Sequence, residues 1–167
     1  MINFIFSIFM NMETYYHGSH ALFDRFDLDH ALEGDGKVKF GFGVYVTSKY
    51  TSAAHYSGSN PNATEHYVYT VEISERTATN CIAFKEPVDP TILAATEARL
   101  GEPVPEKYLQ DAGKEFRKFL AMKLTGQKKV TLEGEKAATA FLLSIGVELI
   151  EWPYNWKNLA LGTNRAV

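Results

Sequence analysis

The sequence of 167 residues contains one cysteine, Cys81, so no disulfide can form within the chain. Because this cysteine stands beside Ile82 at a strand or strand end, we expect a buried thiol rather than a nucleophile. The formal net charge is −3. This charge argues against broad, sequence-independent binding to nucleic acid, which requires a basic surface to release counterions. It leaves nucleic acid open as a substrate.

The sequence also lacks a long hydrophobic run. Residues 1–11, MINFIFSIFMN, are apolar but too short to span a bilayer, and they have neither a basic region nor a small-residue cleavage site. We therefore expect no signal peptide and no membrane association. Met10 and Met12 each offer a later start. An extension, a flexible leader and a partner-binding strand remain alternatives for this segment.

Two common cofactor motifs are missing. The glycines of Gly34–Gly36 and Gly41–Gly43 do not form a dinucleotide-binding fingerprint, because the third glycine and the downstream acidic residue are absent. This disfavours a Rossmann dehydrogenase. The chain also has no HExxH motif and no Cys/His pairs at ligand spacing, so we expect His55 and His66 to be surface or strand-face residues rather than metal ligands.

The composition is that of a globular protein, with 46% hydrophobic and 22% charged residues. Such a length fits one domain, which we place at residues 12–167. Apolar residues alternate in the most distinct strand, 66–73, and helical periodicity dominates the middle of the chain. We thus predict an α+β fold with strands at 14–17, 66–73 and 147–152 and helices at 91–100, 107–125 and 133–145.

The rest of the chain is organised around the stretch FGFGVYVTSKYTSAAHYS, residues 40–57. Residues 43–47 have the β-branched and aromatic content of a short strand. Ser48 is a candidate N-cap for a helix over 49–56, which Gly58 would end. A strand with Tyr45 and a helix with Tyr56 would place two aromatic faces around one slot, which suits a flat ring.

This stretch resembles the signature of the diphtheria-toxin-like and poly(ADP-ribose)-polymerase-like ADP-ribosyltransferases, which reads roughly FGKGIYFADxxSKSANYC. His17-Gly18-Ser19 likewise resembles the HGS motif on the first core strand of that family. The two motifs come in the order of the family, and its eleven-residue step separates Tyr45 from Tyr56. Taken singly, these residues are typical of structural positions, but as an ordered set they favour a functional site.

The resemblance implies a site for NAD as co-substrate. Tyr45 and Tyr56 would hold the nicotinamide ring, since stacking on an aromatic face contributes on the order of 1–3 kcal/mol. His17 would bond the adenosine ribose, and the backbone of Gly18 would meet the nicotinamide carboxamide. The further positions that the resemblance places at the cofactor are Ser19, Thr47 and Ala54. Where the family often has a serine hydroxyl on the carboxamide, this chain has Ala53.

The third catalytic position of the family is usually glutamate. The segments 146–150 and 157–161 resemble the GxDGI and EYVVFD stretches of related bacterial toxins, and this alignment puts Asn158 at that position. Asn158 can hold a ribose hydroxyl but cannot offset a full charge. Glu148 and Glu151 are nearby alternatives, and Glu151 is the runner-up. The missing glutamate disfavours poly-ADP-ribose elongation.

The resemblance thus implies a split β-sheet core with a helical insertion and the activity of a mono-ADP-ribosyltransferase. The target would be a protein or a nucleic acid, recognised through the helical insertion. A small toxin, effector or anti-defence factor of this kind acts in the cytoplasm of its own or a target cell and is paired with an antitoxin or immunity protein. A catalytically inactive NAD or ADP-ribose binding module and an NAD glycohydrolase are the alternatives.

Overall fold

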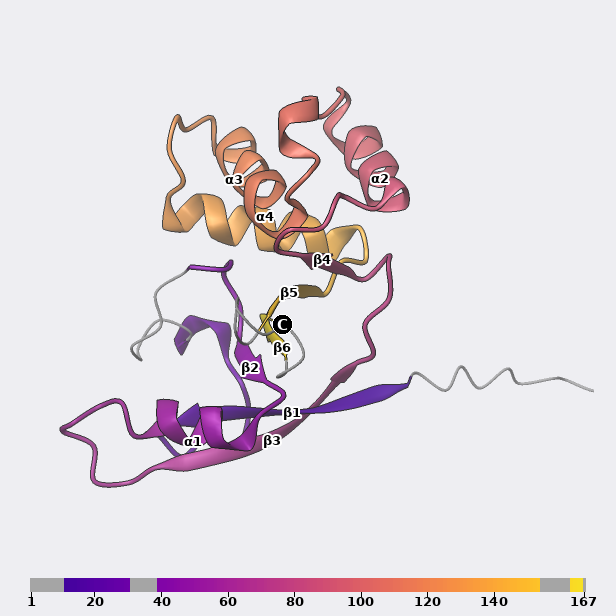
Figure 1. Cartoon of the computed structure of the whole chain (residues 1–167). Coiled ribbons are helices and arrows are strands. Elements are labelled where there is room, and N and C mark those ends of the chain that lie inside the picture. The colour runs from indigo at the N-terminus through magenta and orange to yellow at the C-terminus, as the bar shows by residue number, and fades with distance from the viewer. Residues whose placement is uncertain (1–10, 31–38, 154–162, 167) are drawn as a thin grey trace, which may run out of the picture.

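The computed structural model describes residues 11–30, 39–153 and 163–166 (Figure 1). Their strands form one sheet in the order β3-β1-β2-β6-β5-β4. The strands are β1 Met12–Ser19, β2 Tyr45–Thr47, β3 Tyr67–Ser74, β4 Cys81–Ala83, β5 Leu149–Pro153 and β6 Thr163–Ala166. The α-helices are α1 Tyr50–Ser57, α2 Pro90–Leu100, α3 Arg117–Thr125 and α4 Leu132–Ser144. The predicted α+β class is confirmed.

Strands β1 and β3 form the longest pairing of the sheet. They run antiparallel, with Met12 opposite Ser74 and Ser19 opposite Tyr67, so that both strands are paired along their whole length. The alternation of β-branched and aromatic residues in YVYTVEIS is typical of a strand. The strands predicted at 14–17 and 66–73 are therefore confirmed.

The remaining strands make the sheet mixed. The pairs β1–β2, β2–β6 and β6–β5 are antiparallel, whereas β4 runs parallel to β5. A parallel pair needs a long crossover connection, and here α2, α3 and α4 all lie between the two strands in sequence. The predicted helical segment of the middle chain is thus the crossover from β4 to β5.

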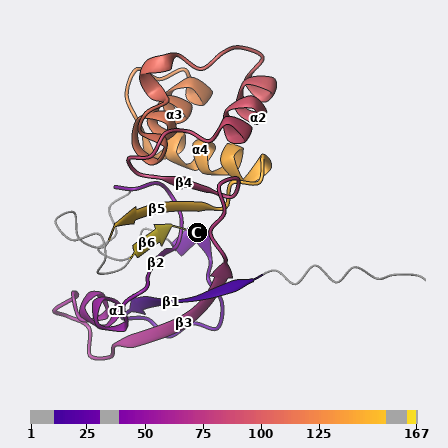
Figure 2. The ribbon, with the colours of Figure 1, turned by 45° about the vertical axis from the view of Figure 1, so that its right-hand side comes forward.

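The larger hydrophobic core lies between this crossover and the sheet. Figures 1 and 2 show α2, α3 and α4 stacked beyond β4 and β5, whereas α1 lies at the other end, beside β1 and β3. Phe116 and Leu120 are fully buried in this core, and Trp152 of β5 closes it on the side of the sheet. None of the helices in the described ranges is long and apolar enough to cross a membrane.

A second, smaller core lies on the opposite face of the sheet. Its buried members are Tyr15, Val46, Ile73, Cys81 and Leu149. These residues come from five strands, including the two edge strands β3 and β4, which the strand order puts farthest apart. The sheet therefore curves around this face, and we call it the concave face.

The helix predicted over 107–125 is interrupted. A short 3-10 turn covers Glu106–Tyr108, a π-helical turn covers Ala112–Phe116, and only Arg117–Thr125 is α-helical. Between these elements the backbone bonds to the segment after β4: the Val88 N–H donates to the Leu109 carbonyl, and the Ala112 N–H donates to the Glu86 carbonyl. A continuous helix would use these groups internally, so the tertiary contacts break it.

Ser48 is not the N-cap of α1. Lys49 occupies that position and makes no side-chain capping bond. The Ser48 hydroxyl instead accepts a hydrogen bond from the Thr163 N–H at 3.0 Å. The prediction was wrong because a partner far away in sequence uses the hydroxyl that would have capped the helix.

Helix α1 packs against β1 at Gly18. A Cβ at this position would overlap the carbonyl oxygen of Ala53 and would lie 2.9 Å from the Ser57 nitrogen. The backbones of the helix and the strand therefore touch directly. Only glycine permits this approach.

A buried ion pair joins α3 to α4. Arg117 is 2% exposed and Glu135 is 4% exposed, and the guanidinium of Arg117 binds the carboxylate of Glu135. The Arg117 Nε also donates to the carbonyl of Gly113 at 3.1 Å. Neither charge can reach water if the other is removed, so the pair determines how the two helices pack.

We predict that Arg117→Met destabilises the protein by about 3–5 kcal/mol, because it leaves the carboxylate of Glu135 buried without a partner. The control is Lys123→Met, which removes an exposed ion pair with Glu102 and should cost at most about 1 kcal/mol. Urea unfolding of both variants measures the difference. Equal small losses would contradict the prediction.

We also predict that Gly18→Ala reduces the free energy of unfolding by about 1–3 kcal/mol, since α1 must move away from β1 to admit a methyl group. Gly58→Ala is the matched control, because a Cβ there has no neighbour nearer than 3.7 Å. Thermal and urea unfolding would test this. A Gly18→Ala variant as stable as the control would show that the two elements are not in rigid contact.

Candidate functional site

His17 lies on β1 with its ring nitrogen Nδ1 2.8 Å from the carbonyl oxygen of Tyr45. Because a carbonyl can only accept, Nδ1 carries the proton and donates it. Burial lowers the pKa of His17 below its ordinary value of 6.5, although this hydrogen bond opposes the shift. The imidazole is therefore neutral at pH 7, and its Nε2 is a hydrogen-bond acceptor.

Aromatic rings surround His17. The ring centroids of Phe26 and Phe23 lie 5.2 and 6.2 Å from that of the imidazole, and Tyr69 of β3 stacks on Phe23 at 4.2 Å. The Tyr69 hydroxyl accepts from the Phe23 N–H at 2.7 Å and donates to the Ala21 carbonyl. Residues 20–30 form a loop with one short 3-10 turn, Leu28–His30.

Tyr45 is half-buried, and its hydroxyl is fully used. It donates to the Gly41 carbonyl at 2.8 Å and accepts from the Phe40 N–H at 3.0 Å. Its ring lies 5.2 Å from that of Trp152, and burial raises the pKa of its phenol. The ring at the start of β2 is thus fixed against the loop that precedes this strand.

Tyr56, in contrast, is 65% exposed near the end of α1. Its recorded ring contact is with His55, at 5.8 Å, and within the described residues its ring does not touch that of Tyr45. Ala53 is buried against Gly18, and Ala54 is half-buried and accepts from the Ser57 hydroxyl. The rings of Tyr45 and Tyr56 are therefore not in contact, and they do not close the predicted slot.

The two other predicted polar contacts serve the chain itself. The Thr47 side chain is 5% exposed, and its hydroxyl accepts from the Lys49 N–H at 3.4 Å, just before α1. The Ser19 hydroxyl accepts from the Ala21 N–H at 3.0 Å, where the chain leaves β1. Both hydroxyls therefore stabilise turns at the ends of the strands that carry the site.

Helix α1 is held at three points. At its start, the Ser48 N–H donates to the Thr163 carbonyl at 3.0 Å. In the middle it rests on Gly18. At its end, the Nδ1 of His66 donates to the Ser57 carbonyl at 2.8 Å, so His66 anchors the helix. The position of Tyr56 relative to β1 follows from these contacts.

The sheet register separates the predicted site residues between two faces. Tyr16 lies opposite Thr47, so Gly18 and Tyr45 point to the side of α1. His17 stands between Tyr16 and Gly18 on β1. Because successive side chains of a strand point to opposite faces, His17 points to the concave face. A ligand that touches both His17 and the α1 side must pass over the end of β1, at Gly18 and Ser19.

Glu151, on β5, is held by two arginines. Its carboxylate lies 2.9 Å from both the Nε and the NH2 nitrogen of Arg165 and 3.1 Å from the Nε of Arg76. Arg165 also binds Glu13 of β1 at 2.7 Å and lies over the ring of Tyr15. In the sheet register, Arg165 lies between His17 and Glu151. His17 and Glu151 are three strand spacings apart, or about 14 Å.

Asn158, the preferred third catalytic residue, lies outside the described residues, as does the leader segment 1–10. Sequence reasoning missed Arg165 and Thr163. The two glutamates that pair with Arg165 give no local signal, because one of them is separated from it by nearly the whole chain. The only hint was an arginine in a short segment that returns to the sheet.

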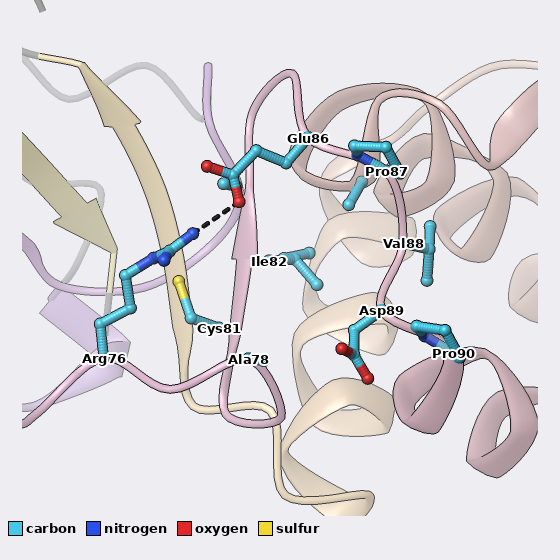
Figure 3. Close-up of a pocket in the computed structure, with 11 residues that line it drawn as sticks. Arg76, Ala78, Cys81, Ile82, Glu86, Pro87, Val88, Asp89 and Pro90 are labelled. Atoms are coloured by element: carbon cyan, nitrogen blue, oxygen red, sulfur yellow. Dashed lines mark hydrogen bonds and ion pairs between the residues drawn. The ribbon is translucent and has the colours of Figure 1, made fainter.

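A hollow of about 270 Å³ lies elsewhere, between β4 and the start of α2 (Figure 3). It shares no residue with the predicted NAD site, and three strands separate β4 from β1. Cys81 lines it and is buried, as predicted, and burial raises the pKa of this thiol to about 11. No cluster of His, Cys, Asp or Glu in the described ranges could hold a metal ion.

The comparisons with known proteins add no relative to this picture. No protein-family model matches the sequence, and searches of curated proteins and of solved structures find no match. The functional argument therefore rests on the residues and the geometry of the chain itself.

Proposed function

We propose that the protein is an NAD-dependent mono-ADP-ribosyltransferase that modifies a protein or nucleic-acid target. The observation that carries the proposal is the state of His17. Its Nδ1–H is committed to the Tyr45 carbonyl, and burial lowers the pKa of the ring, so Nε2 is left as a hydrogen-bond acceptor on the residue before Gly18. A ribose hydroxyl is a suitable donor for this nitrogen.

Tyr56 is the second support. Its ring is exposed, whereas the ring of Tyr45 is fixed by two hydrogen bonds and by Trp152. An exposed ring on an anchored helix can stack on a flat cationic ring such as nicotinamide. In this arrangement Tyr56 supplies the stacking face and Tyr45 a fixed wall of the site.

The reaction breaks the bond between nicotinamide and ribose through an oxocarbenium-like transition state. The electron pair of that bond leaves with nicotinamide, and a nucleophile of the target bonds to the ribose carbon and loses its proton. The chain must hold the ring, fix the ribose and stabilise positive charge. Tyr56 and His17 would serve the first two tasks.

In this proposal Asn158 occupies the third catalytic position, where it would fix a ribose hydroxyl, with Glu151 as the alternative. Glu151 already neutralises Arg165 and Arg76, so its carboxylate would have to give up ion pairs to act on a ribose. A neutral amide fixes a hydroxyl without offsetting charge. Transfer of a single ADP-ribose fits such a site better than chain elongation.

The same observations favour a second candidate, a module that binds NAD or ADP-ribose without cleaving it. Ala53 offers no hydroxyl to a carboxamide, and Glu151 is engaged in ion pairs. A ligand that binds only the folded protein raises its stability. This candidate predicts thermal stabilisation by NAD without release of nicotinamide, and no stabilisation at millimolar NAD would contradict it.

We predict that the purified protein releases nicotinamide from NAD and that His17→Ala and Tyr56→Ala each lower kcat/KM. Loss of about 1–3 kcal/mol of stacking at Tyr56 corresponds to a decrease of about 5- to 150-fold. His17→Ala should lose tenfold or more, because it removes the ribose acceptor. Nicotinamide release is measured by chromatography, with circular dichroism to verify folding.

The matched control is His55→Ala, which removes an exposed imidazole from the residue next to Tyr56 and should leave turnover unchanged. Labelled NAD, followed onto lysate protein and nucleic acid, identifies the acceptor class; release without transfer would indicate a glycohydrolase. Wild-type turnover by folded His17→Ala and Tyr56→Ala variants would disprove the site.

We further predict that NAD binding weakens in acid. Because burial lowers the pKa of His17, Nε2 stays an acceptor down through pH 6.5 and is lost only as the pH falls below the depressed pKa. Stability follows the same sign: below about 6.5 the unfolded chain binds a proton that the folded chain does not, so the free energy of unfolding decreases. His17→Gln should remove this acid dependence from both the KM profile and the stability profile. An unchanged acid dependence would assign it to another group.

A further inference from the structure

Thr163, the first residue of β6, makes three hydrogen bonds to two other parts of the sheet. Its side-chain oxygen lies 2.5 Å from the hydroxyl of Tyr15. Its N–H donates to the Ser48 hydroxyl, and its carbonyl accepts from the Ser48 N–H, both at 3.0 Å. One residue thus ties β1 and the segment between β2 and α1 to β6.

Both partners of Thr163 lie close in sequence to the predicted site. Tyr15 precedes His17 by two residues on β1, so the two side chains share the concave face. Ser48 stands just before α1, which carries Tyr56. A displacement of Thr163 would therefore also displace β1, which carries His17, and α1, which carries Tyr56.

The bond between Thr163 and Tyr15 is held in place by burial. Tyr15 is 3% exposed, and a buried hydroxyl without a partner is destabilising. Burial also raises the pKa of its phenol, so the hydroxyl keeps its proton. The bond to Tyr15 therefore fixes Thr163 relative to β1, and the two bonds to Ser48 fix the start of α1 relative to Thr163.

We propose that Thr163 is a positioning residue of the NAD site, which fixes α1 and Tyr56 relative to His17 on β1. The inference rests on the proposed function. Thr163 touches no ligand in this scheme and acts through Tyr15 and Ser48. Small displacements of positioning groups can reduce turnover by up to about 100-fold.

The test compares Thr163→Val with Thr163→Ser. Valine keeps the shape and suits a strand but removes the bond to Tyr15, whereas serine retains the hydroxyl. We expect Thr163→Val to lower kcat/KM for NAD by about 10- to 100-fold, Thr163→Ser to restore it, and Tyr15→Phe, which removes the other partner, to match valine. The pH dependence assigned to His17 should be unchanged in the variants.

Thr125→Val is the matched control, since it removes one side-chain hydrogen bond, to the Ala121 carbonyl, at the end of α3. It should leave kcat/KM unchanged. A purely structural role would predict that Thr163→Val and Thr125→Val lower thermal stability alike and that turnover well below the melting temperature is normal. That result would overturn the proposal.

A second measurement does not depend on NAD turnover. Amide chemical shifts of Ala53 and Ser57 should change in Thr163→Val and Tyr15→Phe but stay near wild-type values in Thr163→Ser. Unchanged shifts would disprove that Thr163 sets the place of α1, whether or not the protein is active. If the variants show these shift changes but the wild-type protein releases no nicotinamide, the proposed function is overturned instead.

Discussion

The buried charge of Arg165 is the constraint on which the sheet depends. The residue is 4% exposed, and its guanidinium binds Glu13 of β1 and Glu151 of β5 while it lies over the ring of Tyr15. Burial opposes its charge, but Tyr15 and the two carboxylates keep its pKa above the ordinary value. Loss of one partner in such a pair leaves an uncompensated charge, which typically costs about 3–5 kcal/mol. Strands β1 and β5 are therefore tied to β6 through Arg165.

The candidate site is built on the same framework. Tyr15 lies beneath Arg165 and bonds Thr163, His17 follows on the same strand, and Ser48 links Thr163 to the start of α1. The imidazole and the exposed ring of Tyr56 thus occupy separate faces of one rigid junction. Among the described residues of the candidate site, the hydroxyls of Tyr45, Thr47 and Ser19 each make a hydrogen bond within the chain.

Local patterns in the sequence predicted the elements well and their long-range partners poorly. Alternation identified β3, and helical periodicity identified α2 and α4, because each of these depends on one buried face. The interruption between Tyr108 and Arg117 could not be predicted, since it arises from backbone bonds to the segment after β4. The motif residues His17, Tyr45 and Tyr56 were found, but their separation between two faces depends on register. The ion pairs of Arg165 and the role of Ser48 join distant segments, which no local signal reveals.

The place of β6 has a consequence for how the chain folds. This strand, the last of the described elements, lies between β2 and β5 in the interior of the sheet. Strands β1 and β3 can pair early through a connection of moderate length, but the two halves of the sheet are joined only when residues 163–166 arrive. Long-range closures of this kind raise the contact order and slow folding. During synthesis, the edges of β2 and β5 therefore stay open to pairing with other chains until residues 163–166 join the sheet.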